Sequence, residues 1–378
     1  MKCVRCGNDD PRYFHEGSKG TYCRKCVRFK RILLDEEISP KAYEVGYGAE
    51  EYRFSFALTK DQERASKQCL SLIRKSDVLL QCVCGAGKTE ITVETISAFL
   101  KEKKKVCYAI SRREVVIELS KRFSRLFPMA DIVSVFGGHH ETVTGDLIIC
   151  TTHQLFRYFE TFDLLIIDEA DAFPLSGDRT LYEIALRSCK GHVIYSTATV
   201  DDTLLSVLKT RPYETVNLYV RPSYKPLPVP RSFTLPSFFL PAVLFMILRK
   251  TKRQTIVFVP RRSLAKTLYR LFRPFFSCTY VTADLPERDE HIRMFREREV
   301  EHIFATSVLE RGITIRGVEV VIYNVKGGVF SSSSMVQMLG RVGRGIEDTG
   351  GNCYILSDHI DKEVRKTLDY LKEANSHL

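Results

Sequence analysis

Short apolar runs alternate with amphipathic stretches along most of the chain after residue 53. The expected strands of the first series lie at 78–80, 106–110, 146–150, 164–167 and 193–199. Each run is nearly free of charge and leads into polar or small residues, which is typical of strands buried on both faces of a parallel sheet. Their alternation with helix-like stretches predicts an α/β fold.

A second series of the same kind follows a break in the pattern. The regularity lapses near residue 210, and prolines at 222, 226, 228 and 230 predict an extended connection. Strands are then expected at 255–259, 279–282 and 302–305, with an amphipathic helix at 261–272. The sequence therefore predicts two tandem parallel-sheet domains, 53–212 and 213–378, behind a small module at 1–34 and a linker at 35–52.

Four of the twelve cysteines lie in the first 26 residues, in the pairs Cys3-x-x-Cys6 and Cys23-x-x-Cys26. Each two-residue gap lets two sulfur atoms approach one ion, and four thiolates satisfy tetrahedral Zn²⁺. Two disulfides are the alternative. Because the other eight cysteines are scattered singly, the distribution fits a reducing compartment, and we predict a zinc site.

The chain has a formal net charge of +11, of which residues 1–34 carry +6 through nine Lys/Arg and three Asp/Glu. A basic balance favours a polyanionic partner, with nucleic acid before an anionic membrane. Aromatic residues between these bases suit base stacking on a single strand, although they can equally fill the small core of the module. These aromatic residues are Tyr13, Phe14, Tyr22 and Phe29.

The longest apolar run, 238–248, is interrupted by Pro241 and is shorter than the roughly 20 residues that cross a bilayer. The N-terminus carries no apolar signal core. We therefore expect a cytoplasmic protein.

The expected strand at 78–80 leads into the turn Gly85-Ala86-Gly87, and Lys88-Thr89 then open an amphipathic helix. Successive backbone N–H groups and a helix N-terminus form a cradle for the β- and γ-phosphates of ATP. Lys88 would neutralise these phosphates, and the Thr89 hydroxyl would hold Mg²⁺. The full motif has an earlier glycine where this chain carries Val83 or Cys82, so an ordinary strand-to-helix turn is the alternative.

The expected strand at 164–167 leads directly into Asp168-Glu169-Ala170-Asp171. Two adjacent carboxylates at the end of a buried strand repel each other unless a cation is present. Mg²⁺ resolves this cost if Asp168 holds the ion, directly or through water, while Glu169 polarises the attacking water. The two motifs together predict a nucleotide site in one sheet.

Three further groups in the first domain follow expected strands or open helices. Gln62 has the donor and acceptor that match the edge of adenine, but alone it is also an unremarkable surface residue. Arg112 and Arg113 follow the strand at 106–110, and Thr151 and Thr152 follow the strand at 146–150. Cations and hydroxyls there suit phosphate contacts, although a helix N-cap explains either threonine equally well.

Two segments of the second domain contain candidate functional residues. They are 306–312, which follows a buried strand, and 337–344. The latter contains two glycines and spaces Arg341 and Arg344 three residues apart, which would place both on one helical face. We expect these arginines to complete the nucleotide site of the first domain as fingers. A solvated basic helix end is the alternative.

In this order the motifs resemble those of superfamily 2 helicases over roughly residues 55–355. The matching positions are Gln62, 85–89, 111–113, 151–153, 168–171, 196–199, 306–312 and 337–344. Segments 83–90 and 309–314, behind a four-cysteine N-terminus, resemble more specifically the ComFA family, the ATP-driven DNA translocases of bacterial competence.

The resemblance implies two RecA-like domains, an ATPase that uses Mg²⁺, a zinc module and single-stranded DNA as partner. It implies catalytic roles for Lys88, Asp168, Glu169, Gln337, Arg341 and Arg344. It implies nucleotide contacts by Gln62, Cys84, Gly85, Ala86, Gly87, Lys88, Thr89, Glu310 and Gly312, with Mg²⁺ at Thr89 and Asp168. It implies contacts with the nucleic-acid strand by Arg112, Arg113, Thr151, Thr152 and Thr306. It implies that Cys3, Cys6, Cys23 and Cys26 are the zinc ligands.

The family also implies partners: the competence uptake channel, a phosphoribosyltransferase-like competence protein, and further copies of the chain. Such partners would place it at the inner face of the cell membrane.

Some residues depart from the helicase pattern. Gln337 stands where RNA helicases with an Asp-Glu-Ala-Asp motif usually have His, and Thr314 stands where many relatives carry an acidic residue. Three functions therefore remain open: a single-stranded DNA translocase, an RNA-remodelling ATPase, and a nucleotide-gated nucleic-acid clamp.

Overall fold

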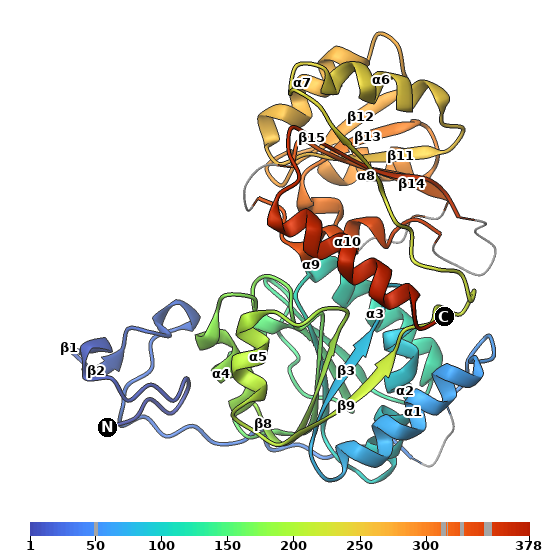
Figure 1. Cartoon of the computed structure of the whole chain (residues 1–378). Helices are drawn as coiled ribbons and strands as arrows, with labels where there is room; N and C mark the ends of the chain where they lie inside the picture. The colour runs from blue at the N-terminus through green and yellow to red at the C-terminus, as the bar shows by residue number, and fades with distance from the viewer. Residues whose placement is uncertain (49–51, 311–314, 316, 326–328, 344–349) are drawn as a thin grey trace. The chain divides into compact units, whose positions relative to one another are not determined.

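The computed structural model of the chain describes residues 1–48, 52–310, 315, 317–325, 329–343 and 350–378 (Figure 1). Its internal contacts divide it into two compact units. The first comprises Met1–Cys82 and Gly87–Leu218, and the second comprises Val83–Ala86 and Tyr219–Leu378. Each unit is built on one parallel sheet, so the predicted fold class, two RecA-like domains with a small cysteine module, is confirmed.

The first unit contains a seven-stranded sheet in the order β5-β6-β4-β7-β8-β3-β9. The strands are β3 (Asp77–Cys82), β4 (Val106–Ile110), β5 (Ile132–Val135), β6 (Leu147–Thr151), β7 (Phe162–Asp168), β8 (Cys189–Thr197) and β9 (Tyr213–Leu218). All pair in parallel, so their carboxyl ends meet at one edge. Residues that follow these strands are therefore brought together there.

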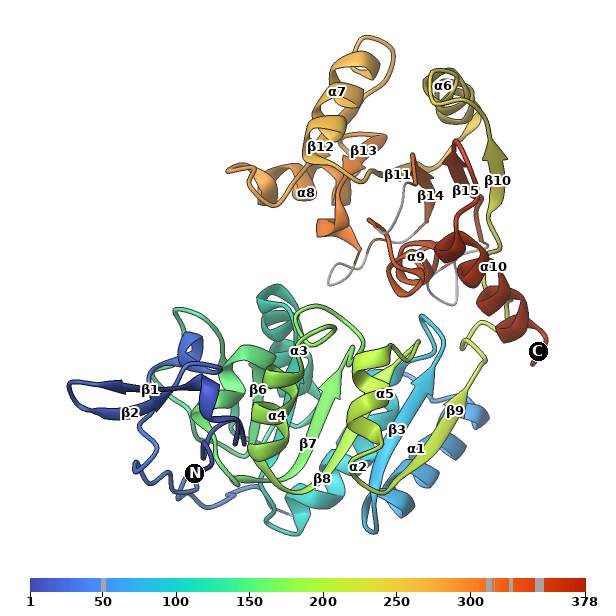
Figure 2. The ribbon, with the colours of Figure 1, turned by 60° about the vertical axis from the view of Figure 1, so that its left-hand side comes forward.

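Helices cover both faces of this sheet, which explains why its central strands are apolar throughout. The helices are α1 (Lys60–Ile73), α2 (Lys88–Lys101), α3 (Arg113–Leu126), α4 (Arg179–Arg187) and α5 (Asp202–Leu208). In Figure 2, α4 and α5 lie in front of the sheet and α1 and α2 lie behind it. Every residue of β4 and of β6 is buried as a result.

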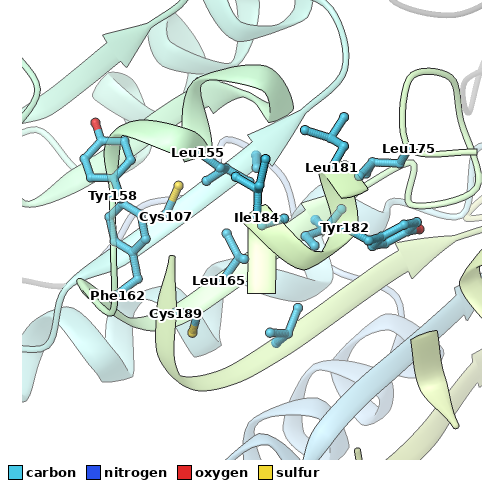
Figure 3. Close-up of a cluster of buried hydrophobic side chains, with 14 of the residues drawn as sticks. Cys107, Leu155, Tyr158, Phe162, Leu165, Leu175, Leu181, Tyr182, Ile184 and Cys189 are labelled. Atoms are coloured by element: carbon cyan, nitrogen blue, oxygen red, sulfur yellow. The ribbon is translucent and has the colours of Figure 1, made fainter. Parts of the chain in front are cut away.

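The core under α4 joins the sheet to this helix (Figure 3). Phe162 and Leu165 of β7 pack there with Leu181 and Ile184 of α4. Scattered cysteines, including Cys107 and Cys189, fill small gaps in the same region, and burial raises the pKa of the Cys189 thiol to about 12. All twelve cysteines are free of disulfides, and of the eight outside the N-terminal module all but Cys278 are buried, as is typical of unreactive core cysteines.

The N-terminal module packs on the first unit instead of standing apart from it. It contains the antiparallel hairpin of β1 (Phe14–Gly17) and β2 (Gly20–Cys23), flanked by 3₁₀ helices η1 (Pro11–Tyr13) and η2 (Val27–Phe29). Phe29 is buried and Phe14 packs against the core cluster, whereas Tyr13 is exposed. Phe14 and Phe29 therefore help to fill the core, whereas Tyr13 does not.

The predicted linker at 35–52 is an extended segment bonded to the first unit. The Lys41 amide donates to Thr161 Oγ1 at 3.1 Å, and the amides of Gly46 and Tyr47 donate to Asp146. Tyr47 is only 1% exposed and packs edge-on against Phe127. Residues 49–51 lie outside the described residues.

The second unit contains a six-stranded parallel sheet in the order β10-β15-β14-β11-β13-β12. Its strands are β10 (Arg231–Thr234), β11 (Gln254–Phe258), β12 (Cys278–Val281), β13 (His302–Ala305), β14 (Val318–Tyr323) and β15 (Cys353–Ser357). Its helices are α6 (Leu240–Lys250), α7 (Arg262–Phe272), α8 (Arg288–Arg296), α9 (Ser332–Leu339) and α10 (Lys362–Asn375). Among the described residues, no helix has the length and apolar character needed to cross a bilayer.

The division between the units falls later than the predicted boundary after residue 212. Residues 213–218 form β9, which pairs with β3 over its whole length and belongs to the first sheet. The sequence hides this edge strand because its exposed positions are polar, so no continuous apolar run marks it.

The buried carboxylate of Asp77 links the edge of the first sheet near β9 to neighbouring segments of the chain. Asp77 is 1% exposed and accepts hydrogen bonds from the Val193 amide at 2.9 Å and from Arg211 Nε at 2.9 Å. Arg211 also donates to the Gly191 carbonyl at 2.9 Å. Three chain segments therefore depend on one charge, and removing it would leave Arg211 and a buried amide without their acceptor.

We expect Asp77→Ala to lower the free energy of unfolding by about 3 kcal/mol, because breaking a buried ion pair from one side strands the other charge. Urea denaturation followed by circular dichroism measures this loss. The exposed Glu141→Ala serves as the control and should shift the midpoint little. Equal midpoints for the two variants would contradict the role given to Asp77.

Candidate nucleotide, metal and nucleic-acid sites

The predicted phosphate loop lies between the end of β3 and the start of α2. Gly85 and Gly87 adopt φ angles of 82° and 88°, a left-handed conformation that other residues rarely tolerate. A Cβ atom on Gly87 would also lie 2.3 Å from Gln62 Nε2. Both glycines are therefore required by the backbone, and Lys88 follows as the first residue of the helix.

Gln62 is brought to this loop by the N-terminus of α1. The side-chain oxygen Oε1 of Gln62 accepts a hydrogen bond from the backbone amide of Thr59 at 3.0 Å. The backbone amide of Gln62 donates in turn to Thr59 Oγ1, and the two bonds form a capping box. Its Nε2 group faces Gly87, and the residue is 4% exposed. The adenine-contact candidate thus lies beside the phosphate loop and has a structural role there.

Asp168 ends β7 and lies 7% exposed at the carboxyl edge of the sheet. Its Oδ1 accepts from Ser196 Oγ at 3.1 Å and from the Glu169 amide at 3.0 Å. Burial raises the pKa of this carboxyl group, the charge of Lys88 opposes that shift, and the charge of Glu169 adds to it. The ionised form therefore depends on nearby positive charge.

Tyr108 lies beneath these groups and was not expected at the site. Burial raises the pKa of its phenol well above the ordinary value, and the charge of Asp168 raises it further while Thr89 acts in the opposite direction. Its hydroxyl is buried without a hydrogen-bond partner among the described residues. An unsatisfied hydroxyl between a threonine and a carboxylate fits a site that takes up a hydrated Mg²⁺ ion.

The hydroxyl residues after β8 hold the acidic motif in place. Ser196 bonds Asp168, and Thr199 Oγ1 donates to Asp171 Oδ2 at 2.6 Å. These two hydrogen bonds join the acidic motif to the end of β8. A displacement of the Asp168 or Asp171 side chain would therefore also displace the residues at the end of β8.

The strand-contact candidates divide into buried and accessible groups. Thr152 is fully buried and Thr151 is 8% exposed, because the chain turns there into the 3₁₀ helix η3 (Thr152–Arg157). The adjacent His153 is exposed, so it is the accessible side chain of this segment. Arg112 precedes α3, and exposed Arg113 begins that helix and lies over the Phe136 ring at 4.9 Å.

In the second unit, Thr306 caps the short helix after β13, and Glu310 accepts from Ser334 Oγ at 2.6 Å. Gln337 lies in α9 and is 3% exposed. Gly312 and Arg344 lie outside the described residues.

The prediction that Arg341 continues a helical face is wrong. Helix α9 ends at Leu339, Gly340 caps it, and Gly343 adopts a φ of 67°, so Arg341 lies in a turn. The guanidinium of Arg221 donates to the Gly340 carbonyl at 3.2 Å and to the Val342 carbonyl at 3.0 Å. These carbonyls lose their helical partners where the helix stops, and Arg221 replaces them.

The four N-terminal cysteines form a buried cluster whose sulfur atoms all lie within 4.8 Å of one another. Cys3 and Cys26 are 3.7 Å apart at sulfur, and Cys6 and Cys23 are 3.8 Å apart, too far for disulfides. The hydrogen bond to Cys26 lowers the pKa of the Cys3 thiol to about 2, and the same contact raises the pKa of Cys26. Four thiolates this close need a cation, and the donor set fits tetrahedral zinc.

Family models match both units. The DEAD/DEAH box helicase model covers residues 59–207, and the helicase conserved C-terminal domain model covers residues 239–345. Among solved structures, S. cerevisiae Dbp5 bound to RNA and ADP BeF3 is similar at a TM-score of 0.63 and 20% identity. The match covers 85% of this chain and 88% of that one, and it supports the fold.

Curated relatives extend the match to the whole chain. The competence protein ComFA of Bacillus subtilis is 31% identical over 397 residues, covering 99% of this chain and 85% of the relative. ComFA of Streptococcus pneumoniae is 28% identical, covering 99% of this chain and 90% of the relative. The ATP-dependent RNA helicase DBP8 of Yarrowia lipolytica is 26% identical over 71% of this chain and 69% of its own length. The chain therefore belongs to the ComFA family of competence proteins, ATP-hydrolysing enzymes of the superfamily 2 helicase type that use ATP and Mg²⁺.

Proposed function

We propose that this protein is an ATP-driven translocase that pulls single-stranded DNA during competence. The observation that supports this most directly is the position of Lys88 close enough to Asp168, at one edge of a parallel sheet, for its charge to lower the pKa of that carboxyl group. A lysine at a glycine loop and a carboxylate pair provide what phosphoryl transfer needs, which is charge neutralisation, Mg²⁺ and an oriented water.

Each residue has a distinct task in this proposal. The backbone of 84–89 cradles the phosphates, Lys88 neutralises them, and Thr89 with Asp168 holds Mg²⁺. Glu169 accepts the proton of the attacking water. Mg²⁺, when bound, would supply the positive charge that offsets the leaving phosphate, and Ser196 keeps the Asp168 carboxylate oriented.

From the second unit, we infer that Gln337, Arg341 and Arg344 act on the same triphosphate. Arginine donors stabilise the charge that develops on the transferred phosphoryl group, which accounts for the two arginines and two glycines in the segment 337–344. Release of this interaction after hydrolysis would let the second unit move along a strand held by Arg112, Arg113, His153 and Thr306.

The module at the N-terminus binds zinc in this proposal through Cys3, Cys6, Cys23 and Cys26. The competence uptake channel and a phosphoribosyltransferase-like competence protein are the expected partners, through which the chain would act at the inner face of the cell membrane. Formation of a homo-oligomer belongs to the same proposal.

An RNA-remodelling ATPase is the second candidate, because DBP8 is named an ATP-dependent RNA helicase and the Dbp5 structure holds RNA. The Asp-Glu-Ala-Asp sequence at 168–171 also favours it, whereas Gln337 does not.

We expect Lys88→Ala to abolish ATP hydrolysis and weaken nucleotide binding, because the phosphates lose their counter-charge. Glu169→Gln should lower kcat by about 10³-fold and leave binding nearly intact, because it removes only the base. Steady-state phosphate release and titration with a fluorescent ATP analogue separate these effects. Loss of binding in Glu169→Gln, or full turnover in either variant, would contradict the assignments.

The double change Arg341→Gln with Arg344→Gln should lower kcat by about 10³-fold or more, as loss of arginine fingers does elsewhere. The control is Arg270→Gln with Arg273→Gln, which removes the same charge from two exposed residues three apart at the end of α7. Thermal melting confirms that both variants fold. Turnover that matches the control would rule out a role for these arginines on the triphosphate.

Single-stranded DNA should stimulate ATP hydrolysis several-fold more than RNA of the same length and sequence. The measurement is the ATPase rate at rising concentrations of each strand at one fixed salt concentration, because binding to either polyanion falls with salt. Stronger stimulation by RNA would favour the second candidate, and slow turnover without movement on DNA in a strand-displacement assay would indicate a clamp.

A further inference from the structure

The zinc-binding module is attached to η3, which follows one of the two segments of the first unit that the motif analysis assigns to contact with the nucleic-acid strand. The ring of Phe29 lies 6.0 Å from the ring of His153 and 6.2 Å from the ring of Phe156, both on η3. Arg5, between the first two cysteines, lies over the same Phe156 ring at 5.7 Å. The cysteine knuckles therefore pack directly against η3.

Polar contacts hold the module to α4 on the other side. Arg187 at the end of α4 donates to the Val4 carbonyl at 3.0 Å, and Arg28 pairs with Asp178, the N-cap of the same helix. All four cysteines, Phe29 and Ile32 belong to the same buried cluster as the core under α4. The module is thus a fixed extension of the first unit, and its position relative to η3 is set by packing.

The surface that this attachment presents is strongly basic. No acidic residue occurs between Glu16 and Asp35, and every cation from 24 to 31 is exposed, while Cys26 between them is buried. These cations are Arg24, Lys25, Arg28, Lys30 and Arg31. Three of them lie over aromatic rings: Lys25 over Tyr13 at 5.6 Å, Arg28 over Phe29 at 4.7 Å and Arg31 over Tyr22 at 4.5 Å.

We propose that the exposed basic residues of the zinc module, Arg24, Lys25 and Arg31, form with Tyr13 a second binding surface for single-stranded nucleic acid, on the module that packs against η3. It rests on the proposed function, since the strand it binds is the one that the motor moves. Exposed cations meet the phosphates, and the 42% exposed ring of Tyr13 offers a stacking platform for a base. The cysteine-bound ion would hold these groups on the small module, which has little core of its own.

A single strand of nucleic acid that contacts η3 and continues over the module would be bound outside the part of the chain that hydrolyses ATP. The module would therefore govern how tightly the strand is held, and not how fast ATP is cleaved once the strand is bound. This separates its contribution from that of Lys88 or Glu169, whose loss acts on the chemical step.

The test uses the full-length, zinc-loaded protein with Lys25→Gln and Arg31→Gln combined. Anisotropy of a fluorescently labelled oligothymidylate should show a dissociation constant raised about tenfold at 0.1 M salt, with the salt dependence reduced by about 0.7 per lost phosphate contact. The strand concentration for half-maximal ATPase stimulation should rise equally, while kcat at saturation and the rate without DNA stay unchanged. Restoring charge with Lys25→Arg and Arg31→Lys should restore binding.

The matched control is Arg12→Gln with Lys19→Gln, which removes two exposed charges from the same module, before β1 and in the hairpin turn. Zinc content, measured by a colorimetric chelator, should equal that of the wild type in all variants. Binding that is unchanged in Lys25→Gln/Arg31→Gln, or weakened equally in the control, would overturn the inference and leave the translocase proposal standing. A wild type that neither binds the oligonucleotide nor responds to it would overturn both.

Discussion

Negative charge buried at the carboxyl edge of the first sheet is the constraint on which the rest of the site depends. Asp168 is placed there by a strand that is apolar on both faces, and Glu169 follows at once. Burial favours the neutral acid, so the arrangement is stable in its ionised form only with Lys88 and a metal ion nearby. In the function proposed above, nucleotide-bound Mg²⁺ would supply the further positive charge that favours the ionised acid.

The same constraint explains why polar side chains appear in a core that is otherwise apolar. Ser196 and Tyr108 come from the two strands that pair with β7, and both direct hydroxyls toward the acid. Thr199 then joins Asp171 to the end of β8. A buried polar network of this kind fixes side-chain directions more strictly than apolar packing does, because each lost partner leaves another group unsatisfied.

Much of this could be predicted from the sequence where local chemistry dominates. β4 and β13 have the bounds that their apolar runs indicate, since a fully buried strand must be apolar throughout. The four cysteines cluster as their spacing requires. Edge strand β9 was missed because its exposed side chains break the pattern, and Tyr108 was missed because a tyrosine within an apolar run reads as core.

Other features depend on tertiary contacts that spacing does not encode. Thr152 is buried where β6 turns into η3, and the carbonyls at the end of α9 are bonded by Arg221, more than a hundred residues earlier in the chain. The aromatic residues of the module show the same principle: Phe29 is drawn into the core by η3, while Tyr13 stays at the surface. The module uses its apolar residues to pack on the first unit. The residues that remain exposed on its surface are therefore the ones that a ligand can contact. The exposed basic residues of the module are therefore a consequence of how the module is attached.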